Sequence, residues 1–451
     1  MTTVPASIPS LRDLGLAIRS GELSPTEHIR DVLDRLGADE HNAVVTLDAD
    51  SALRQAAALT EELARGEWRG PLHGVAVGIK DLFDVVGLPT RAGSNVLADA
   101  PPATSEGPVV TRLREAGAVI VGKLHTHEFA YGPSGDVSGT GPARNPHDRG
   151  RITGGSSSGS GAAVAAGHVP LALGTDTGAS VRVPAALCGV VGLKPTLGRL
   201  STDGVFPLSE TCDHVGLLTG DVHSASVAWD VLSRADGTGG GIQLPGVSGV
   251  RAGVLPDPYW QAADPVLNDG VAAAVQRLTA GGAHVVEVQT PMIDELAASY
   301  SEIVGAEAYA THAAWLAQRH EDYQPFTAQR LQALADQPAH AYIDALRARR
   351  RLSAAFRAAC DEAGGVDMLV LPTTRLRATP IGQRKVEIDG ETVPVWSSLL
   401  ALTLPFNLTG WPAVSVPGHV SDGGLPVGVQ IVGVRLEERG VLRVASALTR
   451  S

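Results

Sequence analysis

Apolar positions repeat at helical spacing in two stretches near the N-terminus. In "SPTEHIRDVLDRLG" (24–37) they recur every three or four residues, which is the period of an amphipathic helix. Ser24 and Glu27 match the pattern of a capping box, and Pro25 suits the first helical position. The segment "DSALRQAAALTEELARG" (50–66) has the same period and predicts a second helix.

Between residues 72 and 178, apolar runs alternate with helical patterns. A buried strand is predicted over "LHGVAVGIKD", which ends in Ile79, Lys80 and Asp81. A helix, a strand, a helix of small residues and another apolar strand are then predicted at "GPVVTRLREAG", "AVIVGKLHTHE", "SGSGAAVAAGHV" and "PLALGTDTG". This alternation favours an α/β fold, in which helices pack on a mixed or parallel sheet.

The second half of the chain becomes helical and then returns to strands. Residues 265–363 are rich in Ala, Leu, Glu, Gln and Arg and predict a largely helical block. Strands resume at "VDMLVLPTT" (366–374) and "LPVGVQIVG" (425–433), so we interpret the block as an insertion or cap on a single core. The glycine-rich stretch at 236–249 has the length of a loop rather than of a linker between domains.

Composition and charge argue against several classes of protein. Apolar residues make up 44% and charged residues 19% of the chain, as in ordinary globular proteins. The net charge of −12 argues against nucleic-acid binding. No apolar stretch reaches the ~18 residues of a membrane span, and the N-terminus lacks a secretory-signal pattern. Cys188, Cys212 and Cys360 form neither a metal-ligand spacing nor a disulfide framework, so we expect a cytoplasmic protein.

The stretch "GGSSSGSG" (154–161) consists of glycine and serine only and is open to several interpretations. A phosphate-binding loop is disfavoured because the stretch has no lysine, and Val164 replaces the third glycine of a dinucleotide fingerprint. The letters "GSSSG" match a nucleophile elbow with Ser157 at its centre. That alternative needs an acid and a histidine later in the chain, for which Asp213 and His214 are candidates.

A metal site is a further alternative. His125 and His127 form an H-x-H pair where a predicted strand ends, and histidine is a common metal ligand. The remaining ligands would come from scattered residues such as His147, His168 or His214, which lie in no supporting motif. A polar loop with two solvated histidines explains the same pattern without a metal.

A lysine at the end of an apolar strand suggests a different chemistry. Burying a charged ammonium is costly, so Lys80 is expected to be neutral, paired with Asp81 or Asp84, or extended towards solvent. Further along, "GTDTGASVRVPAA" places Ser180 in a turn of small residues, where successive backbone N–H groups can point at one oxyanion. A serine, a second hydroxyl and a lysine are the parts of a hydrolase that uses lysine as its base.

Several uncommon motifs also occur in order along most of the chain: "GIKD", "GKLHTHEFAYG", "RNPHD", "GGSSSGSGAAVAAG", "LALGTDTGASVRVPAALCGVVGLKPT", "LPFNLTGWPAVSVP" and "GLPVGVQIVG". Lys80 precedes Ser156 by 76 residues, and Ser156 precedes Ser180 by 24. In these motifs and spacings the chain resembles the amidase signature family of Ser–Ser–Lys amide hydrolases. The resemblance implies a single α/β domain over residues 1–451, with a mixed central sheet covered by helices on both faces. Its parts would be a signature core at about 71–220, a helical cap at about 265–363, and C-terminal strands and a helix at about 364–451.

The resemblance also implies a role for each matching residue. Ser180 would be the nucleophile, Ser156 the bridging serine, held in a cis peptide bond, and Lys80 the base. The other implied roles are an oxyanion hole formed by the backbone of Thr177, Gly178, Ala179 and Ser180, support from Asp176, Arg182 and Ser157, and substrate contact at Ala130, Tyr131, Gly132, Gly154 and Gly155. Lys80 can accept a proton only when neutral, so its pKa must fall from ~10.4 to around 7, a shift that burial can supply.

Two positions depart from the family pattern. The family usually has Gly-Gly-Ser at the nucleophile, whereas this chain has Gly178, Ala179 and Ser180. A positive φ would strain alanine by about 1 kcal/mol or more, so we predict a negative φ at Ala179 and a working oxyanion hole. Ala76 stands where proline is common before the lysine strand, and we expect only local consequences.

Together these residues predict a hydrolase that cleaves a C–N acyl bond in an amide, anilide or carbamate through an acyl-enzyme, with no metal and no cofactor. The expected partner is the small-molecule substrate, not nucleic acid or a membrane, and the chain would be a monomer or a homodimer. Within the family, the alternative is the glutaminase subunit of a tRNA-dependent amidotransferase. A metal-dependent amidohydrolase using His125 and His127, and a non-catalytic member with a binding role, are the remaining alternatives.

Overall fold

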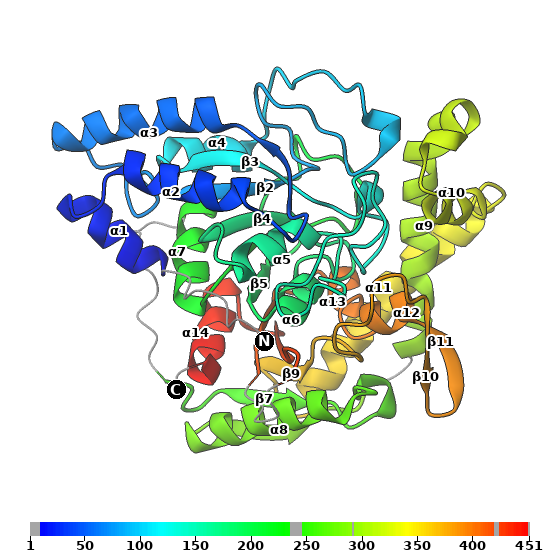
Figure 1. Ribbon diagram of the computed structural model, residues 1–451. Helices are drawn as coiled ribbons and strands as arrows, with labels where there is room; N and C mark the ends of the chain where they lie inside the picture. Colours follow the sequence, from blue (N-terminus) through cyan, green and yellow to red (C-terminus); the bar gives the residue numbers. More distant parts are fainter. Residues whose placement is uncertain (1–9, 235–245, 291–292, 419–423, 450–451) are drawn as a thin grey trace.

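One large β-sheet runs through the computed structural model, which describes residues 10–234, 246–290, 293–418 and 424–449 (Figure 1). Its strands within those residues are β1 (Val44–Leu47), β2 (Ala76–Lys80), β3 (Val119–Leu124), β4 (Leu171–Thr175), β5 (Val191–Lys194), β6 (Val215–Thr219), β7 (Arg251–Val254), β8 (His284–Glu287), β9 (Met368–Pro372), β12 (Ala413–Pro417) and β13 (Gly428–Gly433). They are ordered β1-β3-β2-β4-β6-β5-β12-β13-β9-β7-β8. Some neighbours are parallel, such as β2 and β4, and others antiparallel, such as β4 and β6. The predicted mixed sheet is therefore confirmed.

Helices cover both faces of this sheet. One face carries α2 (Pro25–Gly37), α3 (Ala49–Ala64), α5 (Ser158–Ala165) and α6 (Arg182–Cys188), and the other carries α1 (Leu11–Ser20), α4 (Pro108–Glu115), α7 (Val222–Leu232), α8 (Pro265–Ala280) and α14 (Glu438–Thr449). Successive side chains of a strand point to opposite faces of the sheet. Ala76 therefore packs in the core on the side of α2 and α3, and Val77 packs in the core on the side of α1 and α7. No helix within the described ranges is both long enough and apolar enough to cross a lipid bilayer.

A third group of helices stands at the side of the molecule opposite α1, α2 and α3 (Figure 1). It consists of α9 (Ile293–Arg319), α10 (Pro325–Gln332), α11 (Ala339–Glu362), α12 (Val395–Leu400) and α13 (Pro405–Leu408), beside the hairpin of β10 (Lys385–Ile388) and β11 (Glu391–Pro394). The predicted helical block at 265–363 thus divides in two. Its first part, α8 and β8, belongs to the main sheet, because β8 pairs with β7 and α8 packs on β9 and β13. The glycine-rich stretch at 236–249 lies largely outside the described residues.

The N-terminal helix α2 begins as its sequence predicts. The Ser24 side chain accepts a hydrogen bond from the backbone N–H of Glu27, and the Glu27 carboxylate accepts one from the Ser24 backbone, which completes the capping box. Ala76, the position where the family favours proline, opens β2 and donates its backbone N–H to Nε2 of His28 at 3.3 Å. Proline has no N–H and could not make this bond.

The arrangement of β2 and β4 brings two polar residues to one place. These strands are parallel neighbours, so their carboxyl ends lie at the same edge of the sheet. Strand β2 ends at Lys80, one residue earlier than predicted, and β4 ends at Thr175. The turn that follows β4 leads into α6, and the glycine–serine loop leads into α5. In open α/β sheets, ligands bind outside the carboxyl ends of the strands, so this edge is where a site is expected.

Candidate active site

Lys80 is the centre of a buried polar group. Its side chain is fully buried, and Nζ donates hydrogen bonds to Oγ of Ser156 and Oγ1 of Thr175, both at 2.7 Å. Burial disfavours the charged ammonium and lowers the pKa of Lys80 to about 7, against the smaller opposing effects of the carboxylates of Asp213 and Asp176. The amine is therefore neutral in a large fraction of molecules at neutral pH.

The two carboxylates next to Lys80 in sequence have other partners. Asp81 pairs with Nζ of Lys123 at 2.9 Å. Asp84 accepts a hydrogen bond from Oγ1 of Thr90 at 2.8 Å. The alternative in which Lys80 is paired with Asp81 or Asp84 is therefore wrong, and so is the alternative in which it extends to solvent, since Lys80 is 0% exposed.

Ser156 reaches Lys80 from the glycine–serine loop before α5. The peptide bond between Gly155 and Ser156 is cis, as the family resemblance predicts. A Cβ on Gly155 would stand 2.7 Å from the backbone N of Gly135, so the loop has no room for a larger residue there. The carbonyl of Ser156 accepts a hydrogen bond from the backbone N–H of His127 at 3.0 Å. These contacts hold the loop while the Ser156 hydroxyl points at Lys80.

Ser180 lies in the turn between β4 and α6. Its carbonyl accepts a hydrogen bond from the backbone N–H of Ser157 at 3.2 Å, which places the turn beside the glycine–serine loop. Among the residues the structure describes, the Ser180 hydroxyl has no hydrogen-bond partner, and no backbone N–H of residues 177–180 donates to an acceptor. Ala179 does not have a positive φ, so the backbone conformation predicted for this residue is confirmed. Successive free N–H groups of this kind can bind an anion.

Asp176 and Arg182 hold the two ends of this turn together. The Asp176 carboxylate accepts hydrogen bonds from the backbone N–H of Val181 at 3.1 Å and from Nε and Nη2 of Arg182 at 3.0 and 2.8 Å. Both side chains of the ion pair are 0% exposed. Burial alone would raise the pKa of Asp176, but the charge and hydrogen bonds of Arg182 outweigh it and hold that pKa well below its usual range.

Residues from the C-terminal motifs complete this support. Nδ2 of Asn407 donates to the carbonyl of Asp176 at 2.8 Å and to its carboxylate at 2.9 Å. Arg182 donates to Oε1 of Gln430 at 2.6 Å and to the carbonyl of Thr403 at 2.9 Å. Sequence reasoning identified the motifs that contain Asn407 and Gln430 but assigned no role to either residue. Asn407 lies on α13 and Gln430 on β13, so both reach the turn from segments far along the chain.

Ser157 is bonded to β4 rather than to an acid and a histidine. Its hydroxyl donates to the carbonyl of Thr175 and accepts from the Thr175 backbone N–H, both at 3.2 Å. Asp213 accepts from Oγ1 of Thr177 at 2.6 Å, and Nδ1 of His214 lies 2.7 Å from a backbone carbonyl. Within the described part of the chain neither of them is hydrogen-bonded to Ser157. The geometry therefore does not favour the nucleophile elbow.

The histidines of the H-x-H pair are buried, so the expected solvated loop is wrong. Both ring nitrogens of His125 are occupied, Nδ1 by Oγ of Ser158 at 2.7 Å and Nε2 by the carbonyl of Gly141 at 2.8 Å. Nδ1 of His127 accepts from the backbone N–H of Gly135 at 3.2 Å. In the described ranges no three His, Cys, Asp or Glu side chains gather in a way that could hold a metal. This donor set does not fit a metal ion.

A cavity of about 230 Å³ opens beside Ser180. Of the predicted site residues, Ala130, Tyr131, Gly132, Thr177 and Ser180 line it. The other predicted residues lie behind this wall and not in it: Lys80, Gly154, Gly155, Ser156, Ser157, Asp176, Gly178, Ala179 and Arg182. Gly154 and Gly155, for which substrate contact was expected, thus shape the loop instead of the cavity wall.

Three large side chains of the cavity wall were not predicted: Tyr300 on α9, Arg330 on α10 and Trp396 on α12. The helical pattern at 265–363 marks Tyr300 and Arg330 only as helix residues, and no element was predicted at Trp396. Nothing in the local sequence shows what such a residue faces. Tyr300 also restricts the turn at the nucleophile. A Cβ on Gly178 would stand 2.2 Å from the Tyr300 hydroxyl, so this position favours glycine, whereas Ala179 packs in the apolar core.

Thr175 and Asp213 were likewise missed as parts of the site. The hydroxyl of Thr175, like that of Ser156, accepts a hydrogen bond from Nζ of Lys80. The only signal for Thr175 in the sequence is its position at the end of an apolar strand. Asp213 was considered only as a partner of the elbow. Burial raises its pKa to about 6, against the lowering effect of its hydrogen bond from Thr177. It thus contacts a residue of the predicted oxyanion turn.

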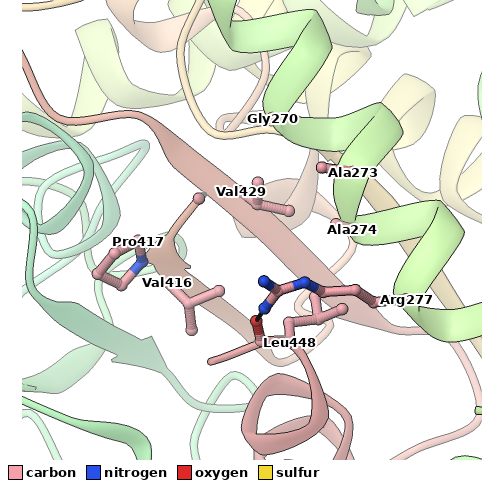
Figure 2. Close-up of a pocket in the computed structure, with 9 residues that line it drawn as sticks. Gly270, Ala273, Ala274, Arg277, Val416, Pro417, Val429 and Leu448 are labelled. Atoms are coloured by element: carbon pink, nitrogen blue, oxygen red, sulfur yellow. Dashed lines mark hydrogen bonds between the residues drawn. The ribbon is translucent and has the colours of Figure 1, made fainter. Parts of the chain in front are cut away.

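A second hollow lies between α8, β12, β13 and α14 (Figure 2). Its volume is about 10 Å³, which is room for about one water molecule. The residues that line it include Gly270, Ala274, Val416 and Val429, and the Arg277 side chain crosses it to donate to the carbonyl of Leu448 at 2.7 Å. This hollow is a gap between packed elements, and the cavity beside Ser180 is the better candidate for a ligand.

Comparisons with known proteins give a consistent result. The family model described as Amidase matches residues 27–442. The chain is 37% identical over 449 residues to the AtzE subunit of 1-carboxybiuret hydrolase from Pseudomonas sp. (strain ADP), with 96% of each chain covered. It is 35% identical over 467 residues to a glutamyl-tRNA(Gln) amidotransferase subunit of Chloroflexus aggregans (strain MD-66 / DSM 9485), with 96% of this chain and 94% of the relative covered.

Solved structures resemble the chain over nearly its whole length. A crystal structure of an amidase has a TM-score of 0.89 at 37% identity and covers 98% of this chain and 99% of its own. A bacterial aryl acylamidase of the amidase signature enzymes has a TM-score of 0.86 at 26% identity, with 98% and 96% covered. The resemblance therefore includes the sheet, the turn at Ser180 and the helices beside the cavity.

Proposed function

The chain belongs to the amidase signature family of hydrolases that act on carbon–nitrogen bonds, and from this premise we propose that it cleaves a C–N acyl bond with Ser180 as nucleophile, Ser156 as bridging serine and Lys80 as base. The proposal is carried by the 2.7 Å hydrogen bond between Nζ of Lys80 and Oγ of Ser156, in surroundings that bring the pKa of Lys80 to about 7. A neutral amine in contact with a hydroxyl can accept its proton. The substrate is a small amide, anilide or carbamate.

In the first half of the reaction, Oγ of Ser180 attacks the substrate carbonyl carbon. Its proton passes to Oγ of Ser156, whose own proton passes to Nζ of Lys80. The tetrahedral intermediate therefore forms without prior ionisation of the Ser180 hydroxyl. The relay then reverses. Lys80 returns a proton through Ser156 to the leaving nitrogen, the C–N bond breaks, and the acyl group remains on Ser180 as an ester.

In the second half, water takes the place of the amine. It attacks the ester carbonyl while its proton passes through Ser156 to Lys80, and the C–O bond to Ser180 then breaks as the proton returns to the serine. One water is consumed, and an acid and an amine, or ammonia, are released. The same two relay residues act in both halves, so the mechanism needs no other base.

Stabilisation of the oxyanion is assigned to the backbone of residues 177–180. Support comes from the absence of any acceptor for these four N–H groups in the described part of the chain. Donors that are held in place before the reaction cost no reorganisation when the negative charge develops. The buried pair of Asp176 and Arg182 keeps the turn in this conformation.

A second candidate function is the glutaminase component of a tRNA-dependent amidotransferase. It is favoured by the 35% identity to the glutamyl-tRNA(Gln) amidotransferase relative over 96% of this chain. In that role the same triad would release ammonia from glutamine for a partner protein. Turnover of an anilide by the isolated chain argues for the first function, whereas activity on glutamine alone, and only with a copurifying partner, argues for the second.

The test of the nucleophile is the intact mass of the protein after exposure to a fluorophosphonate probe. We expect one adduct on the wild type and on Ser157→Ala, and none on Ser180→Ala, because Ser180 lines the cavity and Ser157 does not. In Lys80→Met the adduct should form more slowly by roughly 10²–10⁴-fold, since the base is gone. Loss of the adduct in Ser157→Ala instead, or its absence from the wild type, would refute the proposed nucleophile.

A further inference from the structure

A buried carboxylate outside the proposed triad joins the core to the helices beside the cavity. Glu128 opens the short turn η2 (Glu128–Ala130) after β3, and its side chain is 0% exposed. Its Oε1 accepts a hydrogen bond from Oγ of Ser94 at 2.7 Å, and its two oxygens accept the backbone N–H of Gln324 at 3.1 and 3.0 Å. Among the described residues no lysine, arginine or histidine forms an ion pair with it. Burying a charge without a cation is costly, so this carboxylate depends on the donors that it contacts.

The contact with Gln324 supplies half of a capping box to α10, whose N-cap residue is Gln324. In α2 the carboxylate that accepts the N-cap N–H belongs to the helix itself, since Glu27 accepts from Ser24 at 2.9 Å. The same position of α10 holds Thr327, and the Gln324 side chain makes no cap. Glu128, 196 residues earlier in the chain, provides the carboxylate instead. The positive end of the α10 dipole faces it, which offsets part of the cost of its burial.

The turn that begins at Glu128 contacts the same helices at two further points. The centre of the Phe129 ring lies 4.4 Å from that of the His312 ring on α9. The carbonyl of Tyr131 accepts a hydrogen bond from Nη1 of Arg330 on α10 at 2.7 Å. One short segment of the core therefore holds the start of α10, its second turn and the neighbouring helix.

This turn has an unfavourable backbone conformation. Phe129 and Ala130 have φ values of 50° and 59°, in the left-handed region that residues with side chains rarely adopt. Strained conformations of this kind persist only where the surroundings fix them. The backbone N–H of Phe129 donates to the carbonyl of Ala92 at 2.8 Å, and that of Glu128 donates to the carbonyl of Val137 at 2.8 Å. The turn is therefore a fixed base on the core, to which α10 is attached.

Helix α10 carries part of the cavity wall but none of the proposed relay. Arg330 of α10 lines the cavity, as do Ala333 and Leu334, which follow the last residue of the helix. Lys80 is hydrogen-bonded to Ser156 and to the end of β4, and in the described ranges these bonds do not involve α10. A shift of α10 would thus change the surface that the substrate contacts and leave the relay in place.

We propose that Glu128 is a positioning residue for substrate binding, because its carboxylate holds the N-terminus of α10 against the core and so sets the cavity wall beside Ser180. The inference rests on the proposed amide hydrolysis, since it assigns to Glu128 an effect on KM. Without this contact α10 occupies its docked position only part of the time, and the apparent affinity for substrate falls by that fraction. Once substrate is bound, the relay is complete and kcat is unchanged.

Two single variants and their combination test the contact from both sides. Glu128→Ala removes the acceptor, and Gln324→Pro removes the N–H donor at a residue whose φ of −64° suits proline. We expect each to raise KM for para-nitroacetanilide roughly tenfold and to change kcat by less than about threefold. The double variant should raise KM no further, because both substitutions remove one contact. A KM effect in the double variant equal to the product of the two single effects would overturn the proposal.

A conservative variant and a matched control separate positioning from general stability. Glu128→Gln keeps an oxygen that can accept the Gln324 N–H, so it should recover most of the KM lost in Glu128→Ala. Glu27→Ala removes the equivalent carboxylate from α2, which does not line the cavity, and should leave KM unchanged. Formation of the fluorophosphonate adduct shows that each variant is folded. A lower kcat with unchanged KM in Glu128→Ala would overturn the positioning role.

Hydrogen exchange keeps this test separate from that of the proposed function. Amide exchange at residues 326–334 requires no turnover, and we expect it to be roughly tenfold faster or more in Glu128→Ala than in the wild type or in Glu27→Ala. Faster exchange supports the contact even if the fluorophosphonate test refutes the nucleophile. Equal exchange in the wild type and in Glu128→Ala would overturn the contact even if the fluorophosphonate test succeeds.

Discussion

At the scale of single residues, the proposed chemistry depends on what surrounds one amine. The Nζ of Lys80 is bonded to two hydroxyl groups, and within the described residues it forms no ion pair with a carboxylate. A carboxylate in contact would hold the lysine in its charged form, whereas buried hydroxyl groups let desolvation dominate. The same side chain would be a poor base in an ion pair and is a suitable one here.

The first prediction concerns the pH dependence of activity. In the proposed mechanism the neutral form of Lys80 is the active one, and burial lowers its pKa to about 7. We therefore expect kcat/KM to fall about tenfold per pH unit as the pH drops below about 7, and to level off above it. Measurement of kcat/KM from pH 5 to pH 9 on an uncharged amide gives the pKa directly. A flat profile through this range would contradict the assignment of Lys80 as the base.

The variant Thr175→Val tests whether this pH profile reports on Lys80. The Thr175 hydroxyl accepts a hydrogen bond from Nζ of Lys80 at 2.7 Å, and a charged ammonium gains more from such an acceptor than a neutral amine does. Its removal should lower the pKa of Lys80 further and move the acidic limb to lower pH. Ser160→Ala, which removes another buried hydroxyl bonded to β4, is the control and should leave the limb in place.

At the scale of elements, the turn between β4 and α6 is held by segments that are far apart in sequence. Asp176 and Arg182 close the turn, and Arg182 reaches Thr403 and Gln430, which lie 221 and 248 residues further along. The ion pair is 0% exposed, so neither charge has water as an alternative partner. We infer that this network sets the conformation of the backbone N–H groups at 177–180.

The second prediction is that Arg182→Met lowers the free energy of unfolding by about 3–5 kcal/mol, because it leaves the Asp176 carboxylate buried and uncompensated. Urea unfolding followed by circular dichroism measures the change. The control is Arg347→Met, which breaks an ion pair with Asp344 whose side chains are 68% and 62% exposed, and should cost about 1 kcal/mol or less. Equal changes in the free energy of unfolding for the two substitutions would show that the buried ion pair stabilises the protein no more than the exposed one.

At the scale of the whole molecule, one sheet joins the early and late parts of the chain. Strand β5, from the predicted signature core, pairs with β6 on one side and with β12 on the other. Strand β13 then continues the sheet to β9 and β7. A piece of the chain that ends at about residue 220 would expose the edge of β5, because its partner β12 begins only at Ala413.

The third prediction is that the chain unfolds as one cooperative unit. We expect a single heat-absorption peak in calorimetry, with coincident loss of near- and far-ultraviolet circular dichroism. A fragment covering residues 71–220 should not give a folded spectrum, because it lacks β12, one of the two partners of β5, and the helices α2 and α3, which pack on β2 and β3. Two separated transitions, or a folded fragment, would contradict the single domain inferred from the sequence.

Local signals in the sequence were sufficient for much of the fold. The capping box at Ser24 and Glu27, the apolar run that ends at Lys80 and the alternation of strands and helices depend on residues close together in the chain. The negative φ at Ala179 followed from the cost of a left-handed alanine. Motif order and spacing selected Lys80, Ser156 and Ser180 as a set, and the contact between Lys80 and Ser156 agrees with that choice.

Other features required the tertiary structure. The burial of His125 and His127, the hydrogen bond from Lys80 to Thr175 and the presence of Tyr300 and Arg330 in the cavity wall have no local signature. Sequence alone determined which elements form and which residue types could perform the chemistry, because propensity, capping and periodicity act between near neighbours. Only packing between distant segments decided which side chains meet, since a helical pattern shows that a face is buried and not what it is buried against.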